Sequence, residues 1–173
     1  YGGNALYDHG HHGNAILSRH PILSHANQDV SDHRFERRGL LHCEIRVAGV
    51  DRPVHCVCVH LGLTAGTRQR QMAALVARLN ALAPPGEPLI VAGDFNDWRN
   101  HADDHLIRQL GVVEVFTALR GRPARSFPCH LPMLRLDRIY VRGFAIDQAE
   151  VHFGAPWNRL SDHAPLTAHL RTH

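Results

Sequence analysis

Two kinds of hydrophobic spacing divide the chain into strand-like and helical segments. Within residues 38–47 the apolar Leu41 and Cys43 alternate with polar neighbours, which predicts a half-buried strand. Residues 54–61 are apolar on both faces, as expected for a strand inside a layered fold. Further strands are predicted over Asn14–Ser18, Ile22–Val30, Pro88–Ala92, Leu136–Val141, Phe144–His152 and Ala164–Leu170.

One long segment follows the helical period. Across Thr64–Ala83 the apolar residues recur every three to four positions and share one helix face, and Arg68 is expected to remain exposed. Pro84 ends this helix, because proline lacks the backbone N–H that would continue it. The remaining expectations are a loop over residues 1–13 and a second helix over His101–Leu110.

The order of these elements predicts a mixed α/β domain. Many short strands with few helices favour a β-sandwich flanked by helices, and 173 residues with 44% hydrophobic positions suffice for one core. No apolar run in the sequence is long enough to predict a transmembrane helix. The four cysteines, at positions 43, 56, 58 and 129, form no metal-binding pair, and a cytoplasmic protein without a disulfide framework is expected.

Arginine supplies the positive charge of the chain, since lysine is absent. Nineteen arginines against sixteen Asp and Glu residues give a net charge of +3. Arginine suits two-pronged contacts with phosphate oxygens, whereas a high-GC coding sequence would also replace lysine by arginine. The charge therefore permits a polyanionic partner such as nucleic acid without requiring one.

Four short segments place polar side chains where apolar, strand-like runs end or pass through. They are Val59–Leu61, Gly93–Asn96, Leu136–Tyr140 and Ser161–His163. A sheet can deliver such side chains to one rim, where two histidines, three aspartates and an asparagine can hold a divalent metal, a water and a phosphate. Each segment alone is a weak signal, because an Asp/Asn turn after a strand is common. The four segments in this order are a much more specific signal of a phosphate-binding metal site.

The spacing within these segments assigns expected roles. Asp94 and Asn96 lie two apart, so in an extended segment both side chains face the same way and can orient or deprotonate a water. Asp162 and His163 are adjacent and would face opposite ways. Asp137 on another predicted strand is therefore the expected partner that raises the pKa of His163. Asp162 is then left to face a metal, which Asp94 would also contact.

Together with Gly13–Arg19, which reads GNAILSR, this ordered set resembles the endonuclease/exonuclease/phosphatase superfamily. That superfamily includes pancreatic-type deoxyribonuclease, abasic-site endonucleases, neutral sphingomyelinases and inositol-polyphosphate phosphatases. The resemblance spans Gly10 to Leu170. It implies a four-layer α/β sandwich of two packed, mostly antiparallel sheets flanked by helices, and it implies Mg²⁺ or Mn²⁺ as cofactor.

The resemblance also assigns roles to two histidines. It implies that His60 contacts the scissile phosphate, with a satisfied core histidine as the alternative. More loosely, it implies that His11 stands where abasic-site endonucleases carry a tyrosine that touches the phosphate. His9, His11 and His12 can instead bind a transition metal adventitiously.

The chain opens on Tyr1, inside the pattern of this family. Family members carry an earlier stretch with an Asn on the first strand and a Glu, a principal metal ligand, on the second, and nothing before Gly10 supplies either. We therefore expect residues 1–173 to be one domain that is incomplete at its N-terminus and lacks its first strands. A sheet without its neighbouring strands exposes an apolar edge, so a homodimer or a strand swap is expected.

Several further residues are candidates for contact with a substrate. Arg34, Arg37, Arg38 and Arg135 can face a phosphate, although solvated strand edges explain most such charges. Trp98 can stack on a base, form a wall of the site or simply pack.

The function predicted from these residues is that of a divalent-metal-dependent phosphohydrolase, and more narrowly a nuclease-like phosphodiesterase in which water attacks a phosphate ester in line. The alternatives are a non-catalytic fragment that acts as a binding or scaffold module, and a phospholipid-headgroup phosphodiesterase. A nuclease needs a basic, aromatic-lined groove, and a lipid enzyme needs an exposed apolar loop, which the sequence does not show. A zinc hydrolase is not favoured, because HExxH or an equivalent spacing is absent.

Overall fold

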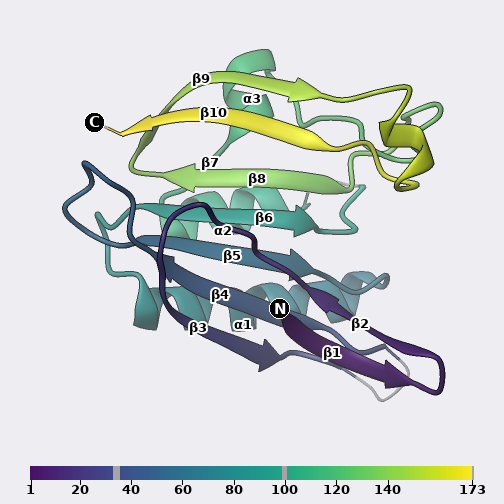
Figure 1. Ribbon diagram of the computed structural model, residues 1–173, viewed down its shortest axis with the longest axis horizontal. Helices are drawn as coiled ribbons and strands as arrows, with labels where there is room; N and C mark the ends of the chain where they lie inside the picture. The colour runs from purple at the N-terminus through teal and green to yellow at the C-terminus, as the bar shows by residue number, and fades with distance from the viewer. Residues whose placement is uncertain (33–35, 99–100, 173) are drawn as a thin grey trace.

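A six-stranded sheet is the centre of the computed structural model, which describes residues 1–32, 36–98 and 101–172 (Figure 1). The strands are β3 (Ile22–Asp29), β4 (Gly39–Ile45), β5 (Val54–His60), β6 (Leu89–Asp94), β7 (Val113–Glu114) and β8 (Asp137–Arg142). They lie in the order β3-β4-β5-β6-β8-β7. β5 and β6 run parallel, whereas the other neighbouring pairs run antiparallel.

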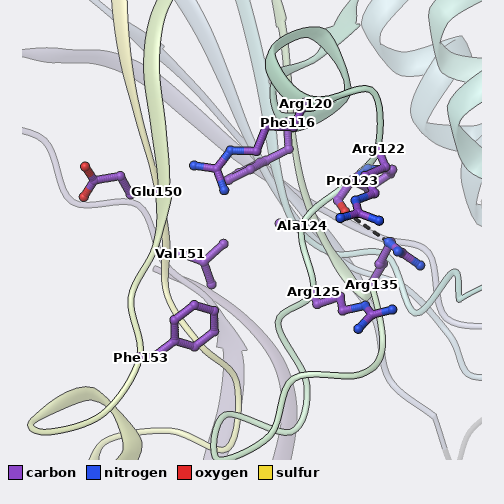
Figure 2. Close-up of a pocket in the computed structure, with 10 residues that line it drawn as sticks. All are labelled: Phe116, Arg120, Arg122, Pro123, Ala124, Arg125, Arg135, Glu150, Val151 and Phe153. Atoms are coloured by element: carbon purple, nitrogen blue, oxygen red, sulfur yellow. Dashed lines mark hydrogen bonds between the residues drawn. The ribbon is translucent and has the colours of Figure 1, made fainter.

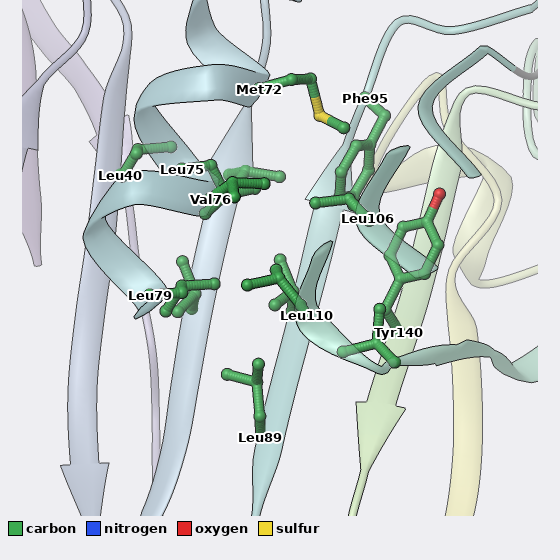
Figure 3. Packing of buried hydrophobic residues seen from close by; sticks show 14 of the residues in the cluster. Leu40, Met72, Leu75, Val76, Leu79, Leu89, Phe95, Leu106, Leu110 and Tyr140 are labelled. Atoms are coloured by element: carbon green, nitrogen blue, oxygen red, sulfur yellow. The ribbon is translucent and has the colours of Figure 1, made fainter. Parts of the chain in front are cut away.

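Two helices, α1 (Ala65–Leu82) and α2 (His101–Leu110), cover one face of this sheet. α1 makes the crossover that the parallel strands β5 and β6 require, and the hydroxyl of its N-cap Thr64 accepts a hydrogen bond in the first turn. The helix predicted over residues 64–83 is thus confirmed to within one residue at each end. The core between helices and sheet is apolar (Figure 3) and includes Leu40, Met72, Leu75, Val76, Leu79, Leu89, Phe95, Leu106, Leu110 and Tyr140.

Two antiparallel hairpins complete the strands. β1 (Gly2–Tyr7) pairs with β2 (Gly10–Asn14), and β9 (Phe144–Val151) pairs with β10 (Leu166–Thr172). In Figure 1 the β1–β2 hairpin crosses in front of the sheet, whereas α1 lies behind it. The loop predicted over residues 1–13 is therefore wrong. Backbone pairing makes this hairpin, and its Gly, His and Asn residues show no apolar alternation.

The sheet face opposite α1 is apolar and only partly covered. Leu41 and Cys43 of β4 are buried there, whereas Cys56 and Cys58 of β5 are half-buried. All four cysteines are free thiols. β4 is buried on both faces rather than half-buried as predicted, since the helix core covers one side and a cluster that includes Ile16 covers the other.

A second, smaller core joins β8 to the C-terminal hairpin. It contains α3 (Val115–Arg120), whose Phe116 packs in one cluster with Val141 and Ala149. The sequence did not predict α3, because six residues are too few to show a helical period. Among the described helices, none is both long and apolar enough to pass through a membrane. The mixed α/β fold class predicted from the sequence is confirmed.

The core beneath α1 should dominate stability. Leu75 is 0% exposed, so Leu75→Ala is expected to lower the free energy of unfolding by about 2–5 kcal/mol in urea denaturation. Leu63→Ala is the matched control, because Leu63 is 57% exposed and its loss should change stability by less than about 0.5 kcal/mol. Equal losses in the two variants would contradict this assignment of the core.

Candidate active site

Three polar residues stand side by side where β5, β6 and β8 meet one rim of the sheet. His60 is the register partner of Asp94, and Asp94 is the register partner of Asp137. The strands approach closely here, since a Cβ atom at Gly93 would lie 2.0 Å from the carbonyl oxygen of Val59. Gly93 also has a φ of 140°, so this alignment requires glycine.

Asp137 is the centre of a short hydrogen-bond chain. Its Oδ2 lies 2.7 Å from Nδ1 of His163 and accepts a second hydrogen bond from the hydroxyl of Ser126. The hydrogen bond with Asp137 raises the pKa of the His163 imidazole above its ordinary value, although burial opposes this effect. The structure thus contains the pair expected from the sequence, and His163 keeps its proton to higher pH than an ordinary histidine does.

Ser126 and His163 lie in two loops that backbone hydrogen bonds join. The N–H of Ala164 donates to the carbonyl of Ser126 at 2.7 Å, and the N–H of Cys129 donates to the carbonyl of Asp162 at 2.7 Å. These two contacts fix the loop before β8 to the loop before β10. The imidazole, the carboxylate and the hydroxyl are therefore held in one arrangement.

His60 has the opposite electrostatic character to His163. Burial, with smaller contributions from nearby cationic groups, lowers the pKa of His60 to about 4. Its Nε2 lies 3.6 Å from Oδ2 of Asp94, beyond the length of a good hydrogen bond. The ring is therefore neutral at pH 7 and can donate one hydrogen bond or accept one. Its contact with the scissile phosphate stays a prediction.

The histidine of β2 that lies beside His60 is His12, whose ring is 6.0 Å away in an edge-on arrangement. His11 is exposed, and its Nδ1 lies 2.6 Å from the hydroxyl of Tyr1. Contact of His11 with a substrate stays a prediction. Adjacent side chains on a strand face opposite ways, and His12 takes the position toward the site.

Asp94 is a half-buried carboxylate at the rim. Burial raises its pKa above the ordinary value, and the negative charge of Asp137 adds to this effect. One of its oxygens accepts a hydrogen bond from the Asn96 N–H at 2.8 Å. A raised pKa makes Asp94 a stronger base than an exposed aspartate.

Asn96 does not continue the extended segment that the sequence suggested. β6 ends at Asp94, and Asn96 has a φ of 50° in the left-handed region. Its side-chain amide is buried and donates to the carbonyl of Leu61 at 2.8 Å. Asn96 therefore ties the end of β6 to the end of β5, and a direct contact of Asn96 with water or phosphate stays a prediction.

Asp162 is exposed and lies in a bend, not in the extended segment that was expected. The N–H of His163 donates there to the hydroxyl of Ser161 at 3.0 Å. Among the residues that the structure describes, no three His, Cys, Asp or Glu side chains gather closely enough to hold a metal ion. Mg²⁺ is commonly held by one or two carboxylates together with waters, so a site for Mg²⁺ or Mn²⁺ does not require such a group. Metal contacts of Asp94 and Asp162 stay predictions.

Arg38 is the predicted arginine whose charge reaches the rim, since it acts on the pKa of both His60 and Asp94. Its Nε donates to the carbonyl of Leu61 at 3.3 Å, and its Nη2 donates to Glu36 at 3.2 Å. Two further predicted arginines lie elsewhere: Arg37 is exposed with Nη1 3.6 Å from Asp29, and Arg34 is outside the described residues.

Trp98 is 45% exposed and packs on Arg68, whose guanidinium carbon lies 5.3 Å from the ring centre. Arg68 was expected to remain exposed but is buried, because its guanidinium donates to the carbonyls of Gly62 and Leu63. Trp98 thus has a structural contact and an accessible surface. Contact between Trp98 and a substrate stays a prediction.

Two loops next to His163 expose large apolar side chains. Leu131 and Met133 are 69% and 60% exposed in the loop before β8, and Leu160 is 73% exposed in the loop before β10. The backbone of residues 127–134 hydrogen-bonds to itself, which leaves the side chains of Leu131 and Met133 outside the turn. The expectation that the chain shows no exposed apolar loop is therefore wrong.

Sequence reasoning gave no role to Ser126 or Asn14. Ser126 had no signal, because its partner Asp137 lies eleven residues further on in a separate element. Asn14 is buried, and its amide donates to the carbonyls of Gly39 at 2.6 Å and Cys58 at 3.1 Å. It thereby fixes β2 against β4 and β5 close to the rim. Its position in the GNAILSR segment was the available signal.

Comparison with known proteins matches residues 1–163 to the endonuclease/exonuclease/phosphatase family. The chain is 50% identical over 170 residues to the protein YbhP of Escherichia coli, and the alignment covers 98% of this chain and 67% of YbhP.

Solved structures share the fold at low identity. An endonuclease/exonuclease/phosphatase from Bacteroides vulgatus has a TM-score of 0.74 at 16% identity, covering 89% of this chain and 67% of that one. TDP2 from D. rerio, solved in complex with a single-strand DNA product, has a TM-score of 0.65 at 20% identity, covering 87% and 68%. At these identities the likeness concerns the fold.

The two histidines at the rim should have widely different pKa values. In metal-free buffer, NMR of the ring protons should give His163 a pKa above 6.5 and His60 a pKa of about 4. Asp137→Asn removes the carboxylate that holds the His163 proton and should lower that pKa. Signals can be assigned from His163→Gln and His60→Gln. An unchanged His163 pKa in Asp137→Asn would contradict the pair.

Asp94 should reduce stability at neutral pH. Because its folded-state pKa is raised above the ordinary 3.8, its favourable contribution is complete below that value and is lost as the pH rises through the folded-state pKa. Asp94→Asn keeps an acceptor for the Asn96 N–H and should therefore raise Tm at pH 7 but not at pH 3. Thermal unfolding at both pH values measures this. The exposed Asp147→Asn is the control, and a lower Tm of Asp94→Asn at pH 7 would refute the effect.

Proposed function

The chain belongs to the endonuclease/exonuclease/phosphatase family, and we propose that its activity is hydrolysis of a phosphodiester. The observation that carries this proposal is the His163–Asp137 pair at the same rim as the half-buried carboxylate of Asp94. A site with a proton donor and a base in separate environments can assist water in attacking an ester.

Asp94 is the proposed base. Its raised pKa increases its affinity for a proton, so it can accept one from a water that attacks phosphorus opposite the leaving oxygen. The new bond forms between the water oxygen and phosphorus as the bond to the leaving oxygen breaks. Asn96 supports this arrangement by holding the end of β6 in place and donating its N–H to Asp94.

His163 is the proposed partner of the phosphoryl group. In its protonated form the ring donates one hydrogen bond to Asp137 and has a second N–H for a phosphoryl oxygen or for the leaving oxygen. Negative charge on the pentavalent transition state is thereby stabilised. Neutral His60 would contribute a hydrogen bond without a competing charge, and Arg38 would contribute positive charge from the side of β4.

Dependence on Mg²⁺ or Mn²⁺ is a further part of the proposal. Such an ion would neutralise charge on the phosphate when bound. The described residues of this chain do not complete a coordination set, so the roles of Asp94 and His163 above are derived without it.

Nucleic acid is the favoured source of the phosphodiester. TDP2, which shares this fold, was solved with a single-strand DNA product, and the positive charge of this chain comes from arginine alone. A phospholipid headgroup is the second candidate. Exposed Leu131, Met133 and Leu160 beside His163 favour it, because apolar side chains at loop tips can enter a lipid surface.

Hydrolysis of bis(p-nitrophenyl) phosphate with Mg²⁺ or Mn²⁺ tests the proposed activity. His163→Ala should lower kcat by about 10²–10⁴-fold, since it removes the proton donor. His169→Ala is the matched control, because His169 is an exposed histidine on β10 outside the proposed site, and it should keep full activity. EDTA should abolish turnover.

Two outcomes would count against this proposal. Equal turnover by His163→Ala and the parent chain would show that p-nitrophenol is released by a contaminating enzyme or by a site that does not use His163. No turnover with either metal would instead favour the alternative of a non-catalytic binding or scaffold module for this chain.

A further inference from the structure

A cavity of about 470 Å³ opens between α3, the loop before Ser126 and strand β9 (Figure 2). Four arginines are among its lining residues, and apolar side chains lie opposite. The residues of interest are Arg120, Arg122, Arg125 and Arg135, with Val151 and Phe153 on the facing side. The cavity is therefore basic on one side and apolar on the other.

Three of these arginines have no acidic partner among the described residues. Within the part of the chain that the structure describes, no carboxylate oxygen lies within ion-pair distance of Arg122, Arg125 or Arg135. Figure 2 shows their guanidinium groups gathered on one side of the cavity. The lining carboxylate, Glu150, lies across from them on β9. The guanidinium of Arg135 donates to the carbonyl of Pro123 at 3.1 Å, and that of Arg120 donates to the carbonyl of Ala149 at 2.6 Å.

The arginines repel one another in the absence of an anion. Burial and the charges of Arg125 and Arg122 lower the pKa of Arg135, so its charged form is disfavoured by its surroundings. These arginines come from two segments and line one cavity. Such an arrangement loses free energy unless a negative group occupies it.

The two segments that carry these arginines also carry residues of the candidate active site. Arg125 directly precedes Ser126, which donates to Asp137. Arg135 lies two residues before Asp137, and two residues of extended chain span only about 7 Å. The segments that position Ser126 and Asp137 therefore also position Arg125 and Arg135, so one substrate molecule can reach both the arginines and His163.

We propose that the cavity of Arg122, Arg125 and Arg135 binds a second phosphate group of the substrate. This inference rests on the proposed function and narrows its substrate class to molecules that carry at least two phosphates. Paired guanidinium groups provide the fork geometry that phosphate oxygens accept. Phe153, which is 56% exposed, leaves an apolar surface beside that phosphate for the part of the substrate that joins the two groups.

Calorimetric titration in EDTA-containing buffer tests the cavity independently of turnover. Thymidine 3′,5′-bisphosphate should bind about tenfold or more tightly than thymidine 5′-monophosphate, because the second phosphate gains charge-assisted hydrogen bonds. The double variant R122Q/R125Q should lose this difference; both side chains are exposed, so the fold should tolerate the change. Arg52→Gln is the matched control. Arg52 is 62% exposed in the turn before β5, at the opposite end of that strand from His60, and the difference should persist.

The same comparison identifies the source of the phosphate. Glycerol 1,3-bisphosphate and glycerol 3-phosphate repeat the test without a base. A gain in both pairs supports a site for phosphate alone, and a gain only in the nucleotide pair supports a nucleic-acid strand as the source. Equal affinity within both pairs overturns the inference, and so does a gain that survives in R122Q/R125Q.

Failure of this inference is separable from failure of the proposed function. Bis(p-nitrophenyl) phosphate carries one phosphate, so its turnover reports on Asp94 and His163 without the cavity. Turnover of that ester together with equal binding of mono- and bisphosphates would leave the phosphodiesterase proposal standing and remove the second phosphate site.

Discussion

The close approach of β5 and β6 at Gly93 is the constraint on which the candidate active site depends. Backbone atoms of the neighbouring strand occupy the space that a Cβ would need there, so only glycine lets His60 align with Asp94. Asp137 then completes the row from β8. Its carboxylate raises the pKa of Asp94 through charge and that of His163 through a hydrogen bond. One backbone contact thus sets the distances that give a base and a proton donor.

The parts that the sequence predicted are those whose burial follows a simple period. α1 was predictable because its apolar residues all face one core. β5 was predictable because apolar residues occur on both of its faces, as in a strand inside a layered fold. The ordered polar segments at strand ends identified the rim. The Asp137–His163 pair followed from geometry, since neighbours in sequence rarely orient each other's side chains.

The parts that the sequence missed depend on contacts between distant segments. The β1–β2 hairpin is held by backbone pairing and has no apolar period to reveal it. The direction of Asn96 follows from a φ of 50°, which a strand pattern does not contain. The arginine cavity needs Arg122 and Arg125 from one segment and Arg135 from another. Taken singly, each of these arginines looks like an ordinary solvated charge.

Two backbone hydrogen bonds join the loop of Ser126 to the loop of His163. They make the spacing of the catalytic groups independent of the side chains that select a substrate. They involve main-chain atoms only, so they persist whichever side chains the loops display. Exposed positions such as Leu131 and Leu160 are then free to diversify, while the imidazole and its carboxylate keep their spacing. A lineage carrying this rim can therefore acquire new substrates by exchanging loop residues, without rebuilding the groups that act on phosphorus.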